Sequence, residues 1–223
     1  MKHLVVLTGA GMSAESGIKT FRGEDGLWEG HDVMQVASPN GFASNPELVL
    51  EFYNQRRRQL LQVKPNQAHL ELANLENYFK VTIITQNIDD LHERAGSTNV
   101  IHLHGELLKV RSTKDENLIL EWTKDLVLGD TDHNGHQLRP HIVWFGEDVP
   151  LIEKAVTICA TADKLLIIGT SLQVYPAASL MHLVPQHIPK YYIDPHPSIS
   201  STKNLTVIPE VATKGINTFI SVL

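Results

Sequence analysis

The chain has 223 residues, enough for one large domain or for one large domain plus a small insertion. Its composition, 42% hydrophobic and 20% charged, is typical of a soluble globular protein. A net charge of −6 disfavours a nucleic-acid partner, and the basic run Arg56-Arg57-Arg58 is too short to form a binding surface for one. No apolar run approaches the roughly 18 residues that span a membrane, so we expect no membrane partner.

The first expected element is a strand at residues 4–8, which are apolar and rich in β-branched side chains. Because this strand leaves no room for a signal or transit peptide, we expect a cytoplasmic protein. Gly9, Gly11 and Ala14 follow with the spacing of a dinucleotide-binding fingerprint. There, the first Gly permits a tight turn, the second lets the backbone approach a pyrophosphate, and the small third residue lets the helix pack on the strand.

A helix behind this turn would direct free N–H groups and the positive end of its dipole at the phosphates. The pattern is short, and a tight strand–helix turn without a ligand is the alternative interpretation. The acidic residue that holds ribose in ordinary dehydrogenases, about 20 residues further on, is not evident, and a polar loop at 20–28 follows instead. We therefore expect a nucleotide site, but not that of an ordinary dehydrogenase.

Strands and helices then alternate along the chain. Short apolar segments predict buried parallel strands at 81–85, 164–168 and 190–193. Helical spacing predicts helices that begin at Pro46, with Asn45 as N-cap, and at 66–78, 149–161 and 176–183. This alternation predicts an α/β fold with a doubly wound parallel sheet, whose ligand lies at the carboxyl ends of the strands.

The single cysteine, Cys159, excludes an internal disulfide, and its apolar neighbours favour a core position over a nucleophile. The segment 107–138 breaks the alternation and is rich in Lys, Asp, Glu and Thr, so we expect a small inserted subdomain there. The large domain then comprises residues 1–106 and 139–223, with a helical insertion at about 28–65.

Polar residues follow the predicted strand at 81–85, at the edge where ligands bind such sheets. They include Gln86, Asn87 and Asp89, whose amide and carboxylate groups suit ribose hydroxyls or a carboxamide. A helix cap built from the same residues is the alternative.

Two further clusters carry groups with chemical potential. Residues 169–171 form another glycine turn behind a strand, with hydroxyls available to a phosphate. His102 and His104 alternate on a short strand at 100–106. A histidine there suits general-base chemistry, although a structural role is commoner for a histidine in a strand.

Five motifs occur in order along the chain. They are Gly-Ala-Gly-x-Ser-Ala-Glu-Ser-Gly-Ile-x-Thr-Phe-Arg-Gly at 9–23, Thr-Gln-Asn-Ile-Asp-Asp-Leu-His at 85–92, His-Gly-Glu at 104–106, Arg-Pro-x-Ile-Val-Trp-Phe-Gly-Glu at 139–147 and Gly-Thr-Ser-Leu-x-Val-Tyr-Pro-Ala at 169–177. Together they closely resemble the motifs of the sirtuins, NAD-dependent protein-lysine deacylases, and the likeness runs from residue 4 to about residue 215. The resemblance implies a Rossmann-type doubly wound parallel sheet with a small inserted subdomain and a catalytic cleft between the two domains.

The resemblance also implies a mechanism. The acyl-lysine carbonyl oxygen attacks C1′ of the nicotinamide ribose of NAD and expels nicotinamide. A ribose hydroxyl, deprotonated through a histidine, closes on the resulting imidate, and water then releases lysine and O-acyl-ADP-ribose. By its His-Gly context this histidine is His104, whose imidazole must be unprotonated at the working pH. Asn87 and Asp89 match the residues that hold ribose, water and the nicotinamide carboxamide.

The same matching implies the contacts to the cofactor, NAD. Phe21 and Arg22 lie on a loop that would cover the nicotinamide and exclude water. Asp194, where the family more often has Asn, would accept from the adenosine ribose and repel a 2′-phosphate, which disfavours NADP. The cofactor-binding residues implied are Gly9, Ala10, Gly11, Ala14, Thr20, Phe21, Arg22, Gln86, Asn87, Ile88, Asp89, Gly169, Thr170, Ser171, Asp194 and Ala212.

For the protein substrate, the resemblance implies an extended peptide between two strands, so that backbone hydrogen bonds give affinity and little sequence is read. The matching edges are 145–147 and 173–175, and Val143 and Phe145 would line the acyl-lysine tunnel. The implied substrate-binding residues are Tyr53, Arg56, Val143, Phe145, Gly146, Glu147, Val174 and Tyr175. The expected partners are acyl-lysine proteins, and the sequence leaves the oligomeric state open.

Tyr53 and Arg56 lie three residues apart on a predicted helix, so the phenol and the guanidinium can face one pocket. They match the Tyr-x-x-Arg signature of the sirtuin class that removes succinyl, malonyl and glutaryl groups. A guanidinium binds a terminal carboxylate bidentately, and the phenol adds a donor, so we expect desuccinylation to exceed deacetylation. The alternative is that Tyr53 packs in the core while Arg56 joins Arg57 and Arg58 on a solvated face.

Most sirtuins carry four zinc-binding cysteines in the small domain, and here the spacing is kept without the ligands. The four positions hold Ser112, Asp115, Thr131 and Asn134, and these side chains offer no tetrahedral zinc site. A replacement set can be imagined from Asp130, Asp132, His133 and His136, although a solvated turn is favoured. We therefore expect no metal, and a subdomain held by its own apolar residues.

Two other functions stay open. An ADP-ribosyltransferase or NAD glycohydrolase on the same fold shares NAD binding and C1′ cleavage and differs in the attacking group. A non-catalytic sensor of NAD or acyl-lysine does not need a general base. The joint presence of His104, Asn87 and Asp89 therefore favours an enzyme over a sensor.

Overall fold

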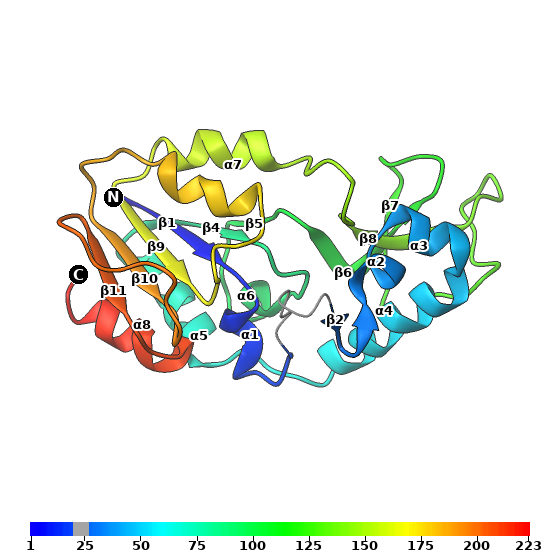
Figure 1. Cartoon of the computed structure of the whole chain (residues 1–223), viewed down its shortest axis with the longest axis horizontal. Coiled ribbons are helices and arrows are strands. Elements are labelled where there is room, and N and C mark those ends of the chain that lie inside the picture. The colour runs from blue at the N-terminus through cyan, green and yellow to red at the C-terminus, as the bar shows by residue number, and fades with distance from the viewer. Residues whose placement is uncertain (20–26) are drawn as a thin grey trace.

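The computed structural model describes residues 1–19 and 27–223, and it centres on a six-stranded parallel sheet (Figure 1). The strands run in the order β11-β10-β9-β1-β4-β5. They are β1 (His3–Thr8), β4 (Lys80–Thr85), β5 (Val100–His102), β9 (Lys164–Ile168), β10 (Lys190–Ile193) and β11 (Leu205–Ile208). The predicted α/β fold with its doubly wound parallel sheet is confirmed, and β11 is an edge strand that the sequence patterns did not indicate.

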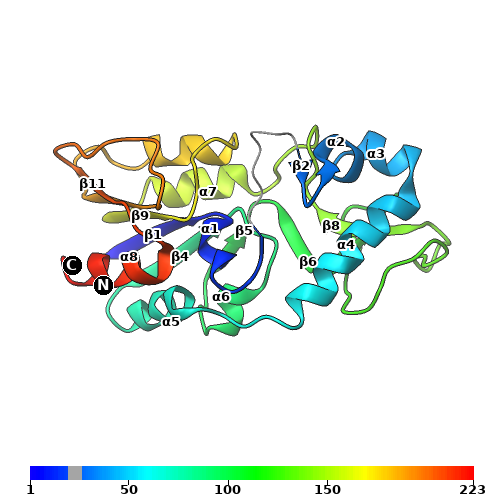
Figure 2. The same ribbon diagram turned by 60° about the horizontal axis from the view of Figure 1, so that its bottom comes forward.

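Helices cover both faces of this sheet (Figures 1 and 2). One face carries α7 (Ile152–Cys159) and the 3₁₀ helix η3 (Ala177–His182), and the other carries α5 (Gln67–Asn74) and α8 (Ala212–Ile220). Every residue of β1 is buried, because Val5 and Leu7 enter the first core while Leu4 and Val6 enter the second. Cys159 is completely buried in the first core, as predicted, and this burial raises the pKa of its thiol to about 12.

A three-stranded antiparallel sheet, in the order β7-β6-β8, lies on the right in Figure 1, at the end of the molecule away from the parallel sheet. Its strands are β6 (Gly105–Ser112), β7 (Ile119–Glu121) and β8 (Leu138–Ile142). Three helices pack with it, namely α2 (Val33–Val36), α3 (Pro39–Ser44) and α4 (Pro46–Leu60). They share a core that includes Phe52, Leu107 and Trp144. A short antiparallel pair, β2 (Leu27–Trp28) and β3 (His31–Asp32), precedes them.

Helix α4 begins where the sequence predicts. The Asn45 side chain accepts a hydrogen bond from the Leu48 N–H at 3.1 Å, and Pro46 occupies the first turn. The remaining short elements are α1 (Gly11–Ala14), α6 (Leu91–Arg94) and the 3₁₀ helix η2 (Leu75–Asn77). Within the described part of the chain, no helix is long and apolar enough to cross a membrane.

Candidate active site

Separate segments of the chain meet at the carboxyl ends of β1, β4 and β9. The Gly11 N–H, in the turn after β1, donates to the Gly169 carbonyl after β9 at 2.8 Å. The segment after β4 joins them, because Gln86 Nε2 donates to Thr170 Oγ1 at 3.1 Å. His104 Nδ1 lies 3.0 Å from the Gln86 carbonyl oxygen. The fold therefore gathers residues that four separate sequence motifs carry.

The two glycine turns pack so closely that side chains are excluded between them. A Cβ on Gly9 would lie 2.7 Å from the Thr170 Cβ, and one on Gly11 would lie 2.8 Å from the Gly169 Cα. Gly169 has a φ of +65°, and a Cβ there would lie 2.1 Å from the Met12 nitrogen. All three glycines are thus required by the contact between the turns.

The structure differs from the predicted fingerprint in three physical details. The N–H groups of Gly9 and Gly11 are not free, because they donate to the carbonyls of Ile168 and Gly169. The helix behind the turn, α1, has only four residues, so its dipole is small. The expectation that Ala14 packs this helix on the strand is wrong, because Ala14 is exposed and the completely buried Met12 enters the core instead.

Ser13 links the two polar residues that follow β4, and the sequence analysis missed it. Asn87 Nδ2 donates to Ser13 Oγ at 3.1 Å, and the Ser13 hydroxyl donates to Asp89 Oδ2 at 2.9 Å. Asp89 is 5% exposed, and this burial raises the pKa of its carboxyl against the opposing bonds from Ser13 and the Leu91 N–H. The only signal for Ser13 is a small hydroxyl one turn into the fingerprint.

His104 has the geometry of a general base. Its Nδ1 lies beside the Gln86 carbonyl, which can only accept, so Nδ1 carries the proton and Nε2 keeps its lone pair. Burial lowers the pKa of this imidazole below its usual value, against the opposing bond to Gln86. A neutral ring with an accepting Nε2 is therefore the form present at pH 7.

His102, by contrast, is engaged on both ring nitrogens. Its Nε2 lies 2.7 Å from Glu93 Oε1, and its Nδ1 lies 3.1 Å from the Asn87 carbonyl. Burial alone would lower the pKa of His102, but the hydrogen bond and the charge of Glu93 raise it. This ring therefore holds the segment after β4 in place and has no nitrogen left to accept a proton.

Of the other residues expected to bind NAD, some lie beside the glycine turns and others do not. Asp194 follows β10 beside the second glycine turn, since the Gly169 N–H donates to the Ile193 carbonyl at 2.9 Å. Ala212 is 3% exposed and packs in the core with Ile193, so its side chain faces the protein interior. Thr20, Phe21 and Arg22 lie outside the described residues.

The expected peptide-docking segments are loops in the structure, not strand edges. Residues 143–147 follow β8, and residues 173–175 follow β9. The Val143 N–H donates to the His104 carbonyl at 2.9 Å, which places the first loop beside the candidate base. Glu147 is ion-paired to Arg139 at 2.6 Å, so its carboxylate is already committed to the fold.

In contrast, two of the residues expected to dock the peptide expose their aromatic side chains to solvent. Phe145 is 42% exposed and Tyr175 is 73% exposed. Gly146 has a φ of +92°, a conformation that favours glycine in the turn beside Phe145. Val174 is half-buried.

Arg56 and Tyr53 are not brought into the same pocket. Arg56 lies in a cavity lined by Ile18, Lys19, Trp28, Glu29, Gln59, Leu60, Ile88, Asp89 and Leu107 among the described residues. Tyr53 is absent from this described lining, is completely buried, and its phenol oxygen accepts from Trp144 Nε1 at 2.9 Å. The alternative that Tyr53 packs in the core is therefore correct for its ring, whereas Arg56 is not on a solvated face.

The guanidinium of Arg56 is only partly satisfied. Its NH1 donates to the Phe52 carbonyl at 2.5 Å, and its carbon lies 3.3 Å from the centroid of the Phe52 ring. Its buried Nε finds no partner among the described residues. Burial lowers the pKa of Arg56 to about 10, so the group remains a cation at neutral pH. A partly buried cation with a donor to spare is suited to a ligand carboxylate.

In the region of the four positions where the family carries zinc cysteines, the Asp132 carboxylate forms hydrogen bonds to two loops. Asp132 Oδ2 accepts from the Ser112 hydroxyl at 2.6 Å, and its Oδ1 accepts from the N–H groups of Asn134 and His136 at 2.8 and 2.9 Å. The Ser112 oxygen in turn accepts from the Asp115 N–H at 3.2 Å. The two loops that carry the cysteine-like spacing are thus cross-linked through Asp132.

Replacing Asp132 with Asn should lower the Tm of the protein, and most strongly at neutral pH. The Ser112 hydrogen bond first, and then those from the His136 and Asn134 N–H groups, hold the pKa of the Asp132 carboxyl well below its usual range. This contribution to stability is therefore complete above the ordinary pKa of an unfolded Asp, about 4, and is lost as the pH falls towards the folded-state value.

Thermal unfolding of both proteins between pH 7 and pH 3 checks this. The Tm gap should narrow in acid, and Asp115→Asn, at an exposed carboxylate in the neighbouring loop, should have little effect. A gap that is absent at pH 7, or that stays constant in acid, would contradict the proposed role of Asp132.

Comparisons with known proteins agree with this geometry. A model of the Sir2 family matches residues 9–176. The chain is 64% identical over 195 residues to an NAD-dependent protein deacylase of Helicobacter pylori, which covers 87% of this chain and 85% of the relative. A protein of the same name from Bacteroides thetaiotaomicron is 54% identical over 223 aligned positions, covering 97% and 95%.

Solved structures extend the likeness to the fold. A Sir2 homolog–NAD complex superposes with a TM-score of 0.88 at 41% identity, covering 99% of this chain and 88% of that chain. A Sir2–p53 peptide–NAD+ complex gives a TM-score of 0.82 at 30% identity, covering 98% and 92%. This chain belongs to the Sir2 family.

Proposed function

We propose that this chain removes succinyl, malonyl and glutaryl groups from protein lysines in preference to acetyl groups, and yields nicotinamide and O-acyl-ADP-ribose. The chain is an NAD-dependent protein deacylase, because relatives of that name are 64% and 54% identical to it over most of their length. The preference is carried by one observation, the under-partnered cation of Arg56 in a cavity that Asp89 also lines.

The residues around the two glycine turns fit NAD. Gly9, Gly11 and Gly169 let the two turns pack together at the carboxyl ends of the strands, and Ser13 and Asn87 supply hydroxyl and amide groups next to them. We propose that these turns, with Ala10, Thr170 and Ser171, hold the phosphates and the adjoining ribose. Asp194 would accept from the adenosine ribose. When bound, NAD supplies an anomeric carbon with nicotinamide as its leaving group.

On the nicotinamide side, we propose that Asn87 and Asp89 orient the ribose and carboxamide, with Gln86 and Ile88 beside them. The Asn87 side-chain amide donates to Ser13, which orients it, and His102 contacts the backbone carbonyl of the same residue. His104 would accept a ribose hydroxyl proton at Nε2, because its Nδ1 is fixed by the Gln86 carbonyl.

For the acyl group, we propose that Arg56 binds the terminal carboxylate with its guanidinium, because this side chain lines the cavity. The Tyr53 oxygen accepts from Trp144, so its own proton can be donated to a second acceptor. Tyr53 is absent from the described lining of the cavity, so the proposal gives the recognition of the carboxylate to Arg56 alone. The protein substrate would lie between the loops at 143–147 and 173–175. A relative solved with a peptide and NAD+ supports a peptide substrate.

We also propose that the small subdomain, residues 107–138, is stable without metal. Within the described part of the chain, no three His, Cys, Asp or Glu side chains are placed to hold a metal ion. Purified protein should therefore contain far less than one zinc per chain by elemental analysis, and a chelator should leave its activity intact. Stoichiometric zinc that is lost together with activity would overturn this.

The acyl preference is tested with four peptides of one sequence that carry acetyl-, succinyl-, malonyl- or glutaryl-lysine. Their kcat/KM values are measured at saturating NAD. We expect the three acidic acyl groups to exceed acetyl by about tenfold or more, since one charged hydrogen bond is worth that much. Equal values for acetyl and succinyl would reject the preference, and no turnover of any peptide would reject the function.

A further inference from the structure

Arg57, next to Arg56 on α4, is a completely buried cation with neutral partners. Its Nε donates to the Leu107 carbonyl at 3.1 Å, and its NH1 donates to Asn54 Oδ1 at 2.7 Å. Its NH2 has no partner among the described residues, and the nearby Asp125 is ion-paired to Arg58 at 2.5 Å. Burying a cation without a contacting carboxylate is unfavourable, so the stability of the fold does not explain Arg57.

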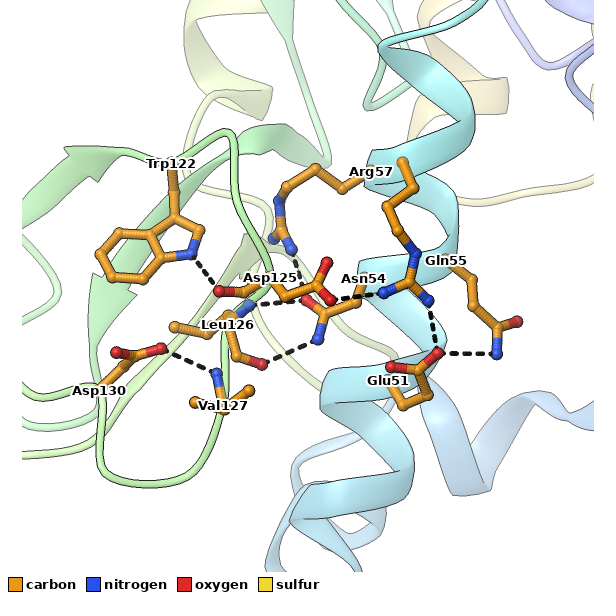
Figure 3. A network of polar contacts seen from close by, with 10 residues as sticks. Glu51, Asn54, Gln55, Arg57, Trp122, Asp125, Leu126, Val127 and Asp130 are labelled. Atoms are coloured by element: carbon orange, nitrogen blue, oxygen red, sulfur yellow. Dashed lines mark hydrogen bonds and ion pairs between the residues drawn. The ribbon is translucent and has the colours of Figure 1, made fainter.

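Asn54 fixes this arginine to the loop that follows β7 (Figure 3). Its Nδ2 donates to the Leu126 carbonyl at 2.9 Å, and its Oδ1 accepts from the Leu126 N–H at 2.8 Å. One side-chain amide thus satisfies both backbone groups of a single residue, while the same Oδ1 receives Arg57. Only an amide can donate and accept in this way, so Asn54 anchors Arg57 and α4 together.

Arg57 also connects two parts of the lining of the Arg56 cavity. One part comes from α4 and includes Arg56 itself, and another includes Leu107, Ile88 and Asp89. The Leu107 carbonyl accepts from Arg57, and the Leu107 N–H donates to the Ile88 carbonyl at 2.8 Å. The distance of Arg56 from Asp89 therefore depends on a hydrogen-bonded path that runs through Arg57.

We infer that Asn54 and Arg57 are positioning residues that set the acyl selectivity of the enzyme by fixing Arg56 in its cavity. The inference rests on the proposed function, because it concerns how the same cavity selects an acidic acyl group. Arg57 touches no substrate in this account. It acts by holding the helix that presents Arg56 against the strand that forms another part of the wall.

The test is a double-mutant cycle read as the ratio of kcat/KM for succinyl- over acetyl-lysine peptides. Arg57→Lys keeps a cation but cannot reach both acceptors, so the ratio should fall by about tenfold, chiefly through a higher KM for the succinyl peptide. In an Arg56→Met background the same change should alter the ratio by less than about twofold, because the residue through which Arg57 acts is gone. Arg58→Lys, on the exposed face of the same helix, should leave the ratio unchanged.

Asn54→Ala provides a second variant that retains the arginine and should lower the ratio in the same direction. The inference is overturned if both peptides lose activity equally, if the Arg57 effect persists in the Arg56→Met background, or if neither variant folds by circular dichroism. A wild type with no succinyl preference, unaffected by Arg56→Met, instead rejects the proposed function and the inference with it.

Discussion

Replacing His104 with Ala should lower kcat for deacylation by about 10²- to 10⁴-fold, the usual contribution of a positioned general base. The loss is expected because the Gln86 carbonyl engages Nδ1 of His104 and leaves Nε2 as the acceptor, whereas His102 has both nitrogens engaged. NAD binding, measured by calorimetry, should change little, since the two glycine turns contact each other without the imidazole.

The pH profile of the wild type gives an independent check on this base. Burial lowers the pKa of His104, so the rate should rise as the pH increases through a value below 6.5 and then level off near neutrality. A variant that retains turnover, or a rate that falls over this acidic range as the pH rises, would remove His104 from the mechanism.

Arg56→Met should reduce the preference for succinyl over acetyl peptides by roughly 10- to 150-fold, and so narrow or invert it. Losing one charged hydrogen bond costs on the order of 1.5–3 kcal/mol, which corresponds to that range. The side chain of Met fills similar space but cannot donate to a carboxylate. The measurement is kcat/KM for both peptides at saturating NAD.

Arg58→Met is the matched control, because Arg58 lies on the same helix and its ion pairs with Glu51 and Asp125 are exposed. Its effect on the ratio should be small, as is usual for surface pairs. If Arg56→Met changed both substrates by the same factor, its role would be in folding and not in acyl recognition.

The sequence predicted the frame of the site because that frame depends on local patterns. The apolar run of β1, the glycines behind it and the N-cap of α4 each carry their signal within a few residues. The glycine turns were predicted to approach a phosphate. The structure adds a second reason for them, which is that Gly11 and Gly169 pack against each other across more than 150 residues of chain.

What the sequence did not predict depends on distant partners. The sequence gives Ser13 no distinguishing signal, because its role depends on hydrogen bonds with Asn87 and Asp89, more than 70 residues away. The (i, i+3) spacing of Tyr53 and Arg56 was correct, but it could not show that the Trp144 indole would hold the Tyr53 phenol in the core.

Burial and pairing were also beyond the sequence. The alternative interpretation places Arg57 on a solvated face, but it is completely buried and donates to the Leu107 carbonyl and to Asn54. The sequence admits Asp132 as a metal ligand, but its partners are the Ser112 hydroxyl, backbone N–H groups of its own turn and the His136 ring. The expected strand edges for the peptide are loops in the structure, because such segments pair as strands only when a peptide is added.

The most direct test is the identity of the products when the protein is incubated with NAD and a succinyl-lysine peptide. Mass spectrometry should find free-lysine peptide, nicotinamide and O-succinyl-ADP-ribose in equal amounts. Plain ADP-ribose beside an intact acyl peptide, or ADP-ribose attached to protein, would show that water or a protein side chain is the attacking group. Either result would contradict the transfer of the acyl group from lysine to the ribose.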